Sequence, residues 1–342
     1  MIGLTLFLLI SILLSWCGTK LQVPFAKQVF IFLLILILGL RHDVGKDYPT
    51  YELIYNVPDS VQANAVEPIW HLINYILRYL GFQARGFFFF TSVIVMVCFY
   101  KGIKNMSSHF YVSVTLFVLL GLYYESANIV RQYVAISILF CGFHYLVEGK
   151  IRKYMVWILF AALFHTSVLI IFPLILLSRF RYPPILLLAA LAISFLFGNT
   201  ILNTLINYVM PSLASLDLYQ YGVDDFDAGV SSGILKLFYN LFACGILFLF
   251  MYRPPSKCAY FHILLNMVVI GMILYNTFYL FQPARRLYLY FFTYLILLIP
   301  YCAEYFKRTS QLIMIGITYL IFLLFLIKAN VGIPYNFDVS FF

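Results

Sequence analysis

Long apolar blocks alternate with short polar connections along almost the whole chain. Each block approaches the ~20 residues that cross a bilayer as a helix. The blocks are Ile2–Trp16, Val23–Leu40, Gly86–Tyr100, Phe110–Tyr124, Ile129–Val147, Tyr154–Leu177, Pro184–Phe197, Ile234–Tyr252, Tyr260–Phe281, Leu287–Tyr301 and Leu312–Ile327. The pattern predicts an all-α polytopic integral membrane protein with about 10–12 transmembrane or re-entrant helices. Residues 1–342 are expected to form a single transmembrane domain.

Two longer polar stretches, residues 41–83 and 199–233, interrupt the pattern and are expected to be external loops. The first contains the segment Pro68–Phe82, whose apolar residues recur at 3.6-residue spacing. This spacing predicts an interfacial helix that lies on the membrane. Its polar face is expected to comprise Trp70, His71, Asn74, Arg78 and Tyr79.

The positions of Lys and Arg predict the orientation, because cytoplasmic loops are enriched in both. The basic groups are Lys20 and Lys27, Lys101 and Lys104, Lys150 to Lys153, Arg253 and Lys257, and Lys307 and Arg308. Placing them inside puts both termini and residues 41–83, 125–132, 199–233 and 282–286 outside. This arrangement requires Tyr154–Leu177 to be a broken or re-entrant pair of short helices. The alternative makes Pro68–Phe82 a full span and Tyr154–Leu177 one plain crossing. This alternative places several basic residues on the outer side of the membrane.

Composition narrows the class of protein further. Hydrophobic residues make up 64% and charged residues 10%, whereas about a quarter of a soluble protein is charged. Soluble enzymes, secreted disulfide scaffolds and free nucleic-acid binders are excluded. The net charge of +9 therefore indicates contact with lipid head groups, and no nucleic acid is expected as a partner. The six cysteines have no metal-ligand spacing and are expected to be small core residues.

Sequence motifs for nucleotide binding and for metal or serine hydrolysis are absent. No cofactor and no bound metal are expected, and any substrate must reach the outer face already activated. The acidic group Asp224–Asp227 in the second loop has the D-x-D spacing of some metal-dependent glycosyltransferases. A solvated acidic loop is the commoner cause of such a group.

Residues 41–51 carry the first candidate site. Gly45 permits a turn with positive φ, and a helix is expected to begin at Pro49. A helix start beside Arg41 and Lys46 suits phosphate oxygens, because backbone N–H groups and cations point the same way. Asp47 is the first candidate for a general base. The alternative interpretation is a hydrated loop with a basic anchor.

Further cations lie at membrane depth or on the predicted outer face. Arg131 lies slightly inside an apolar block, where an unpaired arginine is costly, so it is a functional candidate or a structural partner of Glu125. His165 lies in the middle of a block. It is expected to be either a packing residue or a group that hydrogen-bonds a phosphate or a sugar. Arg285 and Arg286 on the outer face need an anion, for which a diphosphate and a lipid head group are alternatives.

These motifs together resemble the EpsG family of Wzy-like polysaccharide polymerases. The resemblance comprises R-x-x-x-G-x-D-Y-x-x-Y at residues 41–51, Glu67-Pro68, Arg131-Gln132, residues 162–167 and Arg285-Arg286, in this order between Lys20 and Arg308. It implies a GT-C-like, lipid-dependent glycosyltransferase of the bacterial inner membrane, with its active site facing the periplasm or the exterior. The implied reaction moves a growing O-antigen or exopolysaccharide chain from undecaprenyl diphosphate onto the non-reducing end of a lipid-linked repeat unit.

The resemblance and the predicted topology together suggest residue roles. Asp47, then Glu67, is the candidate base; Arg131 and His165 complete the catalytic set. The residues expected to bind substrate or diphosphate are Arg41, Lys46, Tyr48, Tyr51, Gln132, Arg285 and Arg286. Lys46 departs from the family pattern, in which a small residue or Thr is commoner. A chain-length regulator and a flippase are possible partners, and a flippase, a ligase or a membrane acyltransferase are the alternative functions.

Overall fold

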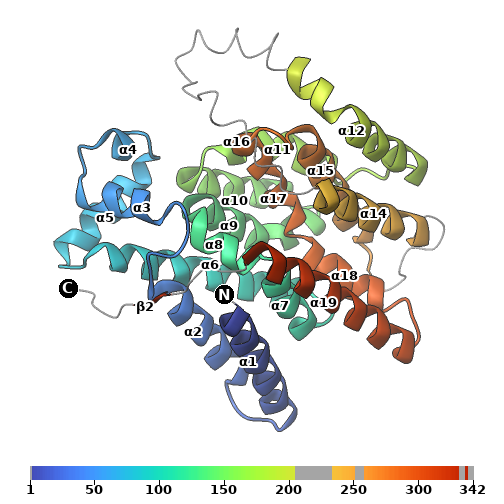
Figure 1. Cartoon of the computed structure of the whole chain (residues 1–342), viewed down its shortest axis with the longest axis horizontal. Helices are drawn as coiled ribbons and strands as arrows, with labels where there is room; N and C mark the ends of the chain where they lie inside the picture. The colour runs from blue at the N-terminus through green and yellow to red at the C-terminus, as the bar shows by residue number, and fades with distance from the viewer. Residues whose placement is uncertain (1, 205–232, 251–257, 331–335, 338–342) are drawn as a thin grey trace. The chain divides into compact units, whose positions relative to one another are not determined.

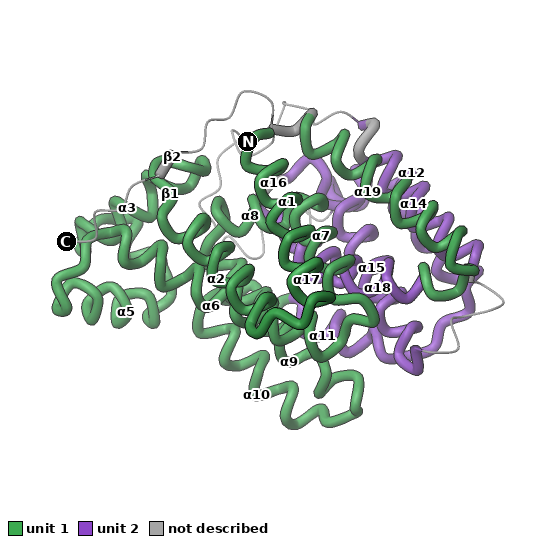
Figure 2. The backbone as a smooth tube through the Cα atoms, turned by 90° about the horizontal axis from the view of Figure 1, so that it is seen from below, with its two compact units in different colours: residues 1–170, 303–342 green, residues 171–302 purple. Residues whose placement is uncertain are grey.

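The computed structural model describes residues 2–204, 233–250, 258–330 and 336–337 (Figure 1). These residues are almost entirely helical and form two compact units, which Figure 2 distinguishes. Unit 1 comprises Met1–Ile170 and Ala303–Phe342, and unit 2 comprises Ile171–Cys302. A membrane domain can contain more than one compact unit, so the expectation of a single transmembrane domain stays a prediction.

The elements follow the apolar blocks closely. Those of unit 1 are α1 (Ile2–Lys20), α2 (Ala26–Gly39), β1 (Arg41–His42), α3 (Tyr48–Asn56), α4 (Val61–Asn64), α5 (Pro68–Tyr79), α6 (Ala84–Met106), α7 (Phe110–Leu119), α8 (Leu122–Asn128), α9 (Val130–Val147), α10 (Ile151–Phe164), α19 (Arg308–Asn330) and β2 (Asn336–Phe337). Helix α11 (Ser167–Leu177) crosses the boundary between the units. Those of unit 2 are α12 (Pro184–Thr204), α14 (Gly233–Phe250), α15 (Phe261–Thr277), α16 (Gln282–Arg285), η3 (Arg286–Tyr288), α17 (Leu289–Phe292) and α18 (Leu295–Ala303), whose last residue belongs to unit 1.

Among the described residues, six helices are long and apolar enough to cross a membrane. They are Ile2–Lys20, Ala84–Met106, Val130–Val147, Pro184–Thr204, Pro283–Ala303 and Arg308–Ile327. The number is seven if the bent pair α7 and α8 is counted as one span, and shorter apolar helices occupy further blocks. The chain is therefore an all-α, multi-pass membrane protein, as the sequence predicts.

The core of unit 1 is a row of helices in which α6 packs against α2 and α9, and α9 packs against α10. Glycines allow these helices to approach closely. A Cβ at Gly102 would collide with the ring of Phe140, and one at Gly142 would collide with Trp157. Close packing through small residues is the usual way in which helices associate where lipid removes the hydrophobic driving force.

Two of the blocks are broken helices. The break within Tyr154–Leu177 falls at His165, which adopts an extended backbone between α10 and α11. The expected helix break is thus present, whereas the choice between a re-entrant pair and one plain crossing stays a prediction. The second break is a correction, because Phe110–Tyr124 was expected to be one helix. The chain bends by 53° between α7 and α8, where Gly121 has a φ of +78°.

Helix α5 corrects the expected polar face of the amphipathic segment. Trp70, Asn74 and Leu77 are buried on one side of the helix, against α6 and α10. Leu72 and Ile76 are exposed instead. The expectation that Trp70 and Asn74 face water is wrong. Nε1 of Trp70 donates to a carbonyl inside the protein, and Asn74 is buried although its Oδ1 has no partner among the described residues.

The two polar stretches that were expected to be loops also contain more structure than expected. Residues 41–83 form a folded cap of α3, α4 and α5, which lie together in Figure 1. Strand β1 pairs antiparallel with β2, with Arg41 opposite Phe337 and His42 opposite Asn336. Helix α12 continues to Thr204, so residues 199–204 are helical rather than loop. Asp224–Asp227 lies outside the described residues.

Candidate functional site

The site in unit 1 is centred on the carboxylate of Glu67. Its Oε2 accepts a hydrogen bond of 2.6 Å from Nη1 of Arg131. Its Oε1 lies 2.9 Å from Nδ1 of His165 and accepts a hydrogen bond of 3.1 Å from the backbone N–H of Thr166. One carboxylate therefore joins the start of α9 to the break between α10 and α11.

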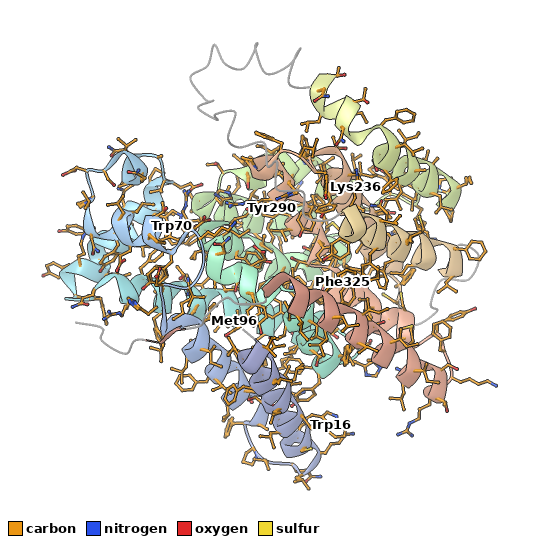
Figure 3. The ribbon with its side chains drawn as sticks, in the orientation of Figure 1. Trp16, Trp70, Met96, Lys236, Tyr290 and Phe325 are labelled. Carbon is orange, nitrogen blue, oxygen red and sulfur yellow. The ribbon has the colours of Figure 1, made fainter. Side chains whose placement is uncertain are left out.

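Local sequence explains how Glu67 reaches this position. Glu67 is the N-cap residue of α5 and has an extended backbone, and Pro68 occupies the first helical position, where its missing N–H costs nothing. Trp70, which is labelled in Figure 3, lies one turn further along. It donates a hydrogen bond of 2.9 Å from Nε1 to the carbonyl of Phe164. This bond satisfies a carbonyl at the end of α10, which the break leaves without a helical partner. Trp70 thus holds the start of α5 against the broken helix.

The environment of Glu67 keeps its side chain ionised. Glu67 is only 8% exposed, and burial by itself would raise the pKa of its carboxyl. The hydrogen bond from His165 and the charge of Arg131 outweigh burial and bring the pKa of Glu67 down to about 2. A carboxylate with so low a pKa is a poor general base at neutral pH. The hydrogen bonds of Glu67 suit it instead to hold Arg131 and His165 in position.

The ionised Glu67 also determines the tautomer of His165. A carboxylate only accepts hydrogen bonds, so the Nδ1 atom that faces Glu67 must carry a proton. In the neutral imidazole Nε2 is then the acceptor, and in the protonated form it is a second donor. Within the described part of the chain Nε2 of His165 has no hydrogen-bond partner. The side chain is 24% exposed, so this nitrogen can meet a ligand.

Arg131, like His165, has nitrogen atoms that Glu67 does not engage. Only Nη1 bonds to Glu67, and Nε is a buried donor without a partner among the described residues. The side chain of Arg131 is 24% exposed. Glu125, the partner considered from the sequence, is exposed, and Glu67 takes that place. Arg131 thus keeps guanidinium donors that Glu67 does not engage, beside a histidine whose Nε2 has no partner among the described residues.

Tyr51 and Gln132 line the same region. The hydroxyl of Tyr51 lies 3.5 Å from the backbone nitrogen of Arg131. Burial raises the pKa of Tyr51 although the charge of Arg131 lowers it, so the phenol stays neutral. Gln132, the next residue on α9, is buried. Tyr51 therefore supports Arg131 from the side of α3, and its ring is packed inside the protein rather than open to a sugar.

Asp47 connects to this region through Asn128. Its backbone N–H donates a hydrogen bond of 3.2 Å to Oδ1 of Asn128, which ends α8 three residues before Arg131. Gly45 makes the approach possible, because its φ is +103° and a Cβ there would lie 3.2 Å from the carbonyl oxygen of Ala127. Asp47 is half-buried, and Lys46 beside it is exposed. Both remain candidates for contact with a ligand.

Arg41 and Tyr48 lie inside the protein. Arg41 is 1% exposed, and its guanidinium donates to the carbonyls of Leu38 and Ala127 and covers the ring of Phe88. The ring of Tyr48 stacks on the ring of Phe88, with 4.3 Å between ring centres. In this structure both side chains hold α2 and the 41–47 turn against α6 and α8. Neither faces a ligand-accessible surface.

Arg285 and Arg286 belong to unit 2. Arg285 ends α16, and its Nη1 donates a hydrogen bond of 2.9 Å to the carbonyl of Tyr279. Arg286 begins η3, and both arginines are partly exposed. Lys236 in the same unit was not predicted from the sequence, although it interrupts the start of an apolar block. Its Nζ lies 5.1 Å from the centre of the Tyr279 ring.

Among the described residues no three His, Cys, Asp or Glu side chains gather as metal ligands do. The described site thus consists of cations, one ionised carboxylate and a histidine with an open nitrogen, carried by a helical multi-pass membrane protein. The family model described as the EpsG family matches residues 27–337, and the chain belongs to this family. Membership indicates a polymerase-type role in polysaccharide biosynthesis. No curated protein and no solved structure matches the chain.

Proposed function

We propose that the protein is a lipid-dependent glycosyltransferase that polymerises a surface polysaccharide, an O-antigen or an exopolysaccharide. It transfers the growing glycan from undecaprenyl diphosphate onto the non-reducing end of a lipid-linked repeat unit, at the outer face of the bacterial inner membrane. The proposal is supported most directly by the hydrogen bonds of Glu67 to Arg131 and His165. They orient one fixed cation and one titratable nitrogen toward accessible space.

The chemistry of the reaction explains why such a pair is useful. Negative charge develops on the leaving diphosphate as the glycosidic bond breaks, and fixed donors lower the barrier if they are already in place. Arg131 supplies such donors, because Nη2 is not engaged by Glu67. The loss of one comparable donor costs roughly 3 kcal/mol in other enzymes.

The acceptor hydroxyl must lose a proton during transfer. Nε2 of His165 is the better placed base, because Glu67 holds the proton on Nδ1 and leaves Nε2 as an acceptor. Asp47 is the alternative base, and Glu67 is assigned to positioning because its pKa lies near 2. Lys46 is assigned to the lipid-linked substrate because it is exposed beside Asp47. A flippase and a chain-length regulator are the proposed protein partners.

The substrate requirement tests this function. Protein reconstituted in liposomes with a lipid-diphosphate-linked repeat unit should form polymer without any nucleotide sugar. A requirement for a nucleotide sugar would contradict the proposed donor. In cells, deletion should leave single lipid-linked units in the outer leaflet. Units trapped in the inner leaflet would indicate a flippase instead, and transfer of finished glycan to another acceptor would indicate a ligase.

A further inference from the structure

Two of the six cysteines meet inside unit 1 although they lie far apart in the sequence. Cys98 belongs to α6 and Cys141 to α9, and these two helices pack against each other (Figure 1). The thiol of Cys98 lies within hydrogen-bonding reach of the thiol of Cys141 and of the hydroxyl of Ser137. Both cysteines are free thiols. Because the two sulfur atoms come from different helices, the spacing of cysteines along the chain does not reveal the pair.

Close packing of the two helices fixes the position of the thiols. Gly102 lies one turn beyond Cys98 on α6. A Cβ at Gly102 would lie only 3.0 Å from the backbone carbonyl oxygen of Phe140, the residue before Cys141 on α9. Ser137, one turn before Cys141, is fully buried and donates a hydrogen bond of 2.8 Å to a carbonyl of its own helix. The two backbones are therefore held close together beside both thiols.

The thiol pair has an accessible sulfur and a cation close by. Cys141 is buried, whereas Cys98 is partly exposed. The ammonium group of Lys101, about one turn further along α6, interacts electrostatically with both thiols, and its side chain is exposed. The positive-inside bias assigns the Lys101 end of α6 to the cytoplasm. Cys98 therefore offers its sulfur toward the cytoplasmic end of the helix, beside a positive charge.

The chemistry of two adjacent thiols favours a soft monovalent metal ion. Thiolate sulfur is a soft ligand that suits Cu(I), zinc and iron–sulfur clusters. Zinc and the clusters take about four protein ligands, and among the described residues no three His, Cys, Asp or Glu side chains gather as metal ligands do. Cu(I), in contrast, is held stably by two thiolates. A disulfide is the other product that a thiol pair can form, but the cytoplasm keeps thiols reduced.

We propose that Cys98 and Cys141 form a two-thiolate binding site for Cu(I) between α6 and α9. Each thiol loses its proton as its sulfur–copper bond forms, so one Cu(I) replaces two protons and the complex carries a single negative charge. The ammonium group of Lys101 balances this charge. The bound ion joins α6 to α9, the helix that carries Arg131 in its first turn. The metal site does not rest on the proposed function.

Copper binding by the purified full chain tests the site. The protein is kept reduced and free of oxygen, and its binding of Cu(I) is measured in competition with the chelator bathocuproine disulfonate. Wild type should bind one Cu(I) more than either Cys98→Ser or Cys141→Ser. The double variant should lose that same single ion, because one ion needs both sulfur atoms. Cys244→Ser is the matched control, because Cys244 is also a partly exposed helical cysteine, and this variant should retain the ion.

Lys101 provides a variant that leaves the packed interface between α6 and α9 intact. Lys101→Gln should weaken Cu(I) binding roughly three- to tenfold, as expected for the loss of one partly screened opposite charge. Lys104→Gln is its control, because Lys104 is exposed on the same helix but lies about one turn further from the thiols. This second variant should bind Cu(I) as wild type does. If the serine variants fail to fold, as judged by their thermal unfolding, the lysine pair decides.

Any of several results would overturn the metal site. Equal Cu(I) binding by wild type and folded Cys98→Ser would show that this thiol is not a ligand. Loss of two ions in the double variant would show that the thiols bind independently. Unchanged affinity in Lys101→Gln would contradict the charge balance. Alkylation of the protein in intact cells, followed by thiol counting, should find Cys98 and Cys141 reduced, and a disulfide between them would make the pair a redox site instead.

Discussion

A single carboxylate organises the site at the residue scale. Glu67 receives hydrogen bonds from Arg131, from His165 and from the backbone of Thr166. Sequence could predict that these side chains share a membrane face, because loop charges indicate the topology. It could not predict that Glu67 is the common acceptor, because that contact depends on where α10 breaks. Because the pKa of Glu67 is low, we propose that this residue positions its neighbours, whereas the sequence alone suggested a base.

The first prediction concerns stability and pH. The pKa of Glu67 is about 2 in the folded protein and is ordinarily 4.5, so its ionisation stabilises the fold above pH 4.5, and that contribution is lost as the pH falls toward 2. The difference corresponds to roughly 3 kcal/mol at neutral pH. Glu67→Gln should therefore lower the unfolding midpoint at pH 7, and the gap to wild type should shrink on acidification below pH 4.5.

Glu52→Gln is the matched control for this measurement. Glu52 lies in α3 of the same cap and is partly exposed. This variant should unfold close to wild type at every pH. A gap between Glu67→Gln and wild type that stays constant from pH 7 to pH 3 would show that the carboxylate is not held ionised as described.

The second prediction separates the two nitrogens of His165. In His165→Asn the side-chain amide nitrogen takes the place of Nδ1 and can still donate to Glu67, but Nε2 is lost. The unfolding midpoint should stay near that of wild type, while the rate of polymer formation should fall roughly a hundredfold, as for a lost general base. His165→Ala should lower both quantities. Wild-type rates in His165→Asn would remove Nε2 from the mechanism.

At the element scale, the apolar pattern predicts most helices. It does not predict where all of them bend or which side of each helix is buried. The block from Tyr154 to Leu177 contains a polar His165 at its middle, and this signal was enough to predict a break. The bend at Gly121 had no polar signal, since glycine is common in membrane helices. The faces of α5 were misassigned because Trp70 bonds to the carbonyl of Phe164, a contact that periodicity alone does not reveal.

The third prediction follows from the exposed side of α5. Leu72, Ile76 and Leu80 are exposed along one stripe, which fits a helix resting on the membrane with these side chains among the lipids. A nitroxide at Ile76→Cys, in a cysteine-free background, should be more accessible to oxygen than to a water-soluble nickel chelate. His71, also exposed on α5, should show the opposite preference as His71→Cys. Equal access to nickel at both positions would contradict an interfacial helix.

At the scale of the whole molecule, membrane class and family follow from composition and motif order, but the roles of individual residues do not. Arg41 belongs to the motif that carried the resemblance, yet its guanidinium is buried on backbone carbonyls. Such a contact requires α2 and α8 to be adjacent, which local sequence does not specify. Lys236 was missed for a related reason, because its ring partners lie on other helices.

The fourth prediction concerns sidedness. Lys46 and Lys101 are both exposed, and the positive-inside bias places them on opposite sides of the membrane. In a cysteine-free protein, Lys46→Cys should react with a membrane-impermeant maleimide added to intact spheroplasts, whereas Lys101→Cys should react only after permeabilisation. The reverse pattern would place the Glu67 site on the cytoplasmic side and contradict the proposed reaction.

The central claim is that the cation held by Glu67 acts on the departing lipid diphosphate. The most direct measurement is polymer formation and release of undecaprenyl diphosphate by reconstituted protein, comparing wild type with Arg131→Gln. Arg152→Gln is the control, because Arg152 is exposed on α10 away from these contacts. We expect Arg131→Gln to lose both products by at least about a hundredfold while Arg152→Gln retains them. Wild-type product formation by folded Arg131→Gln would contradict the claim.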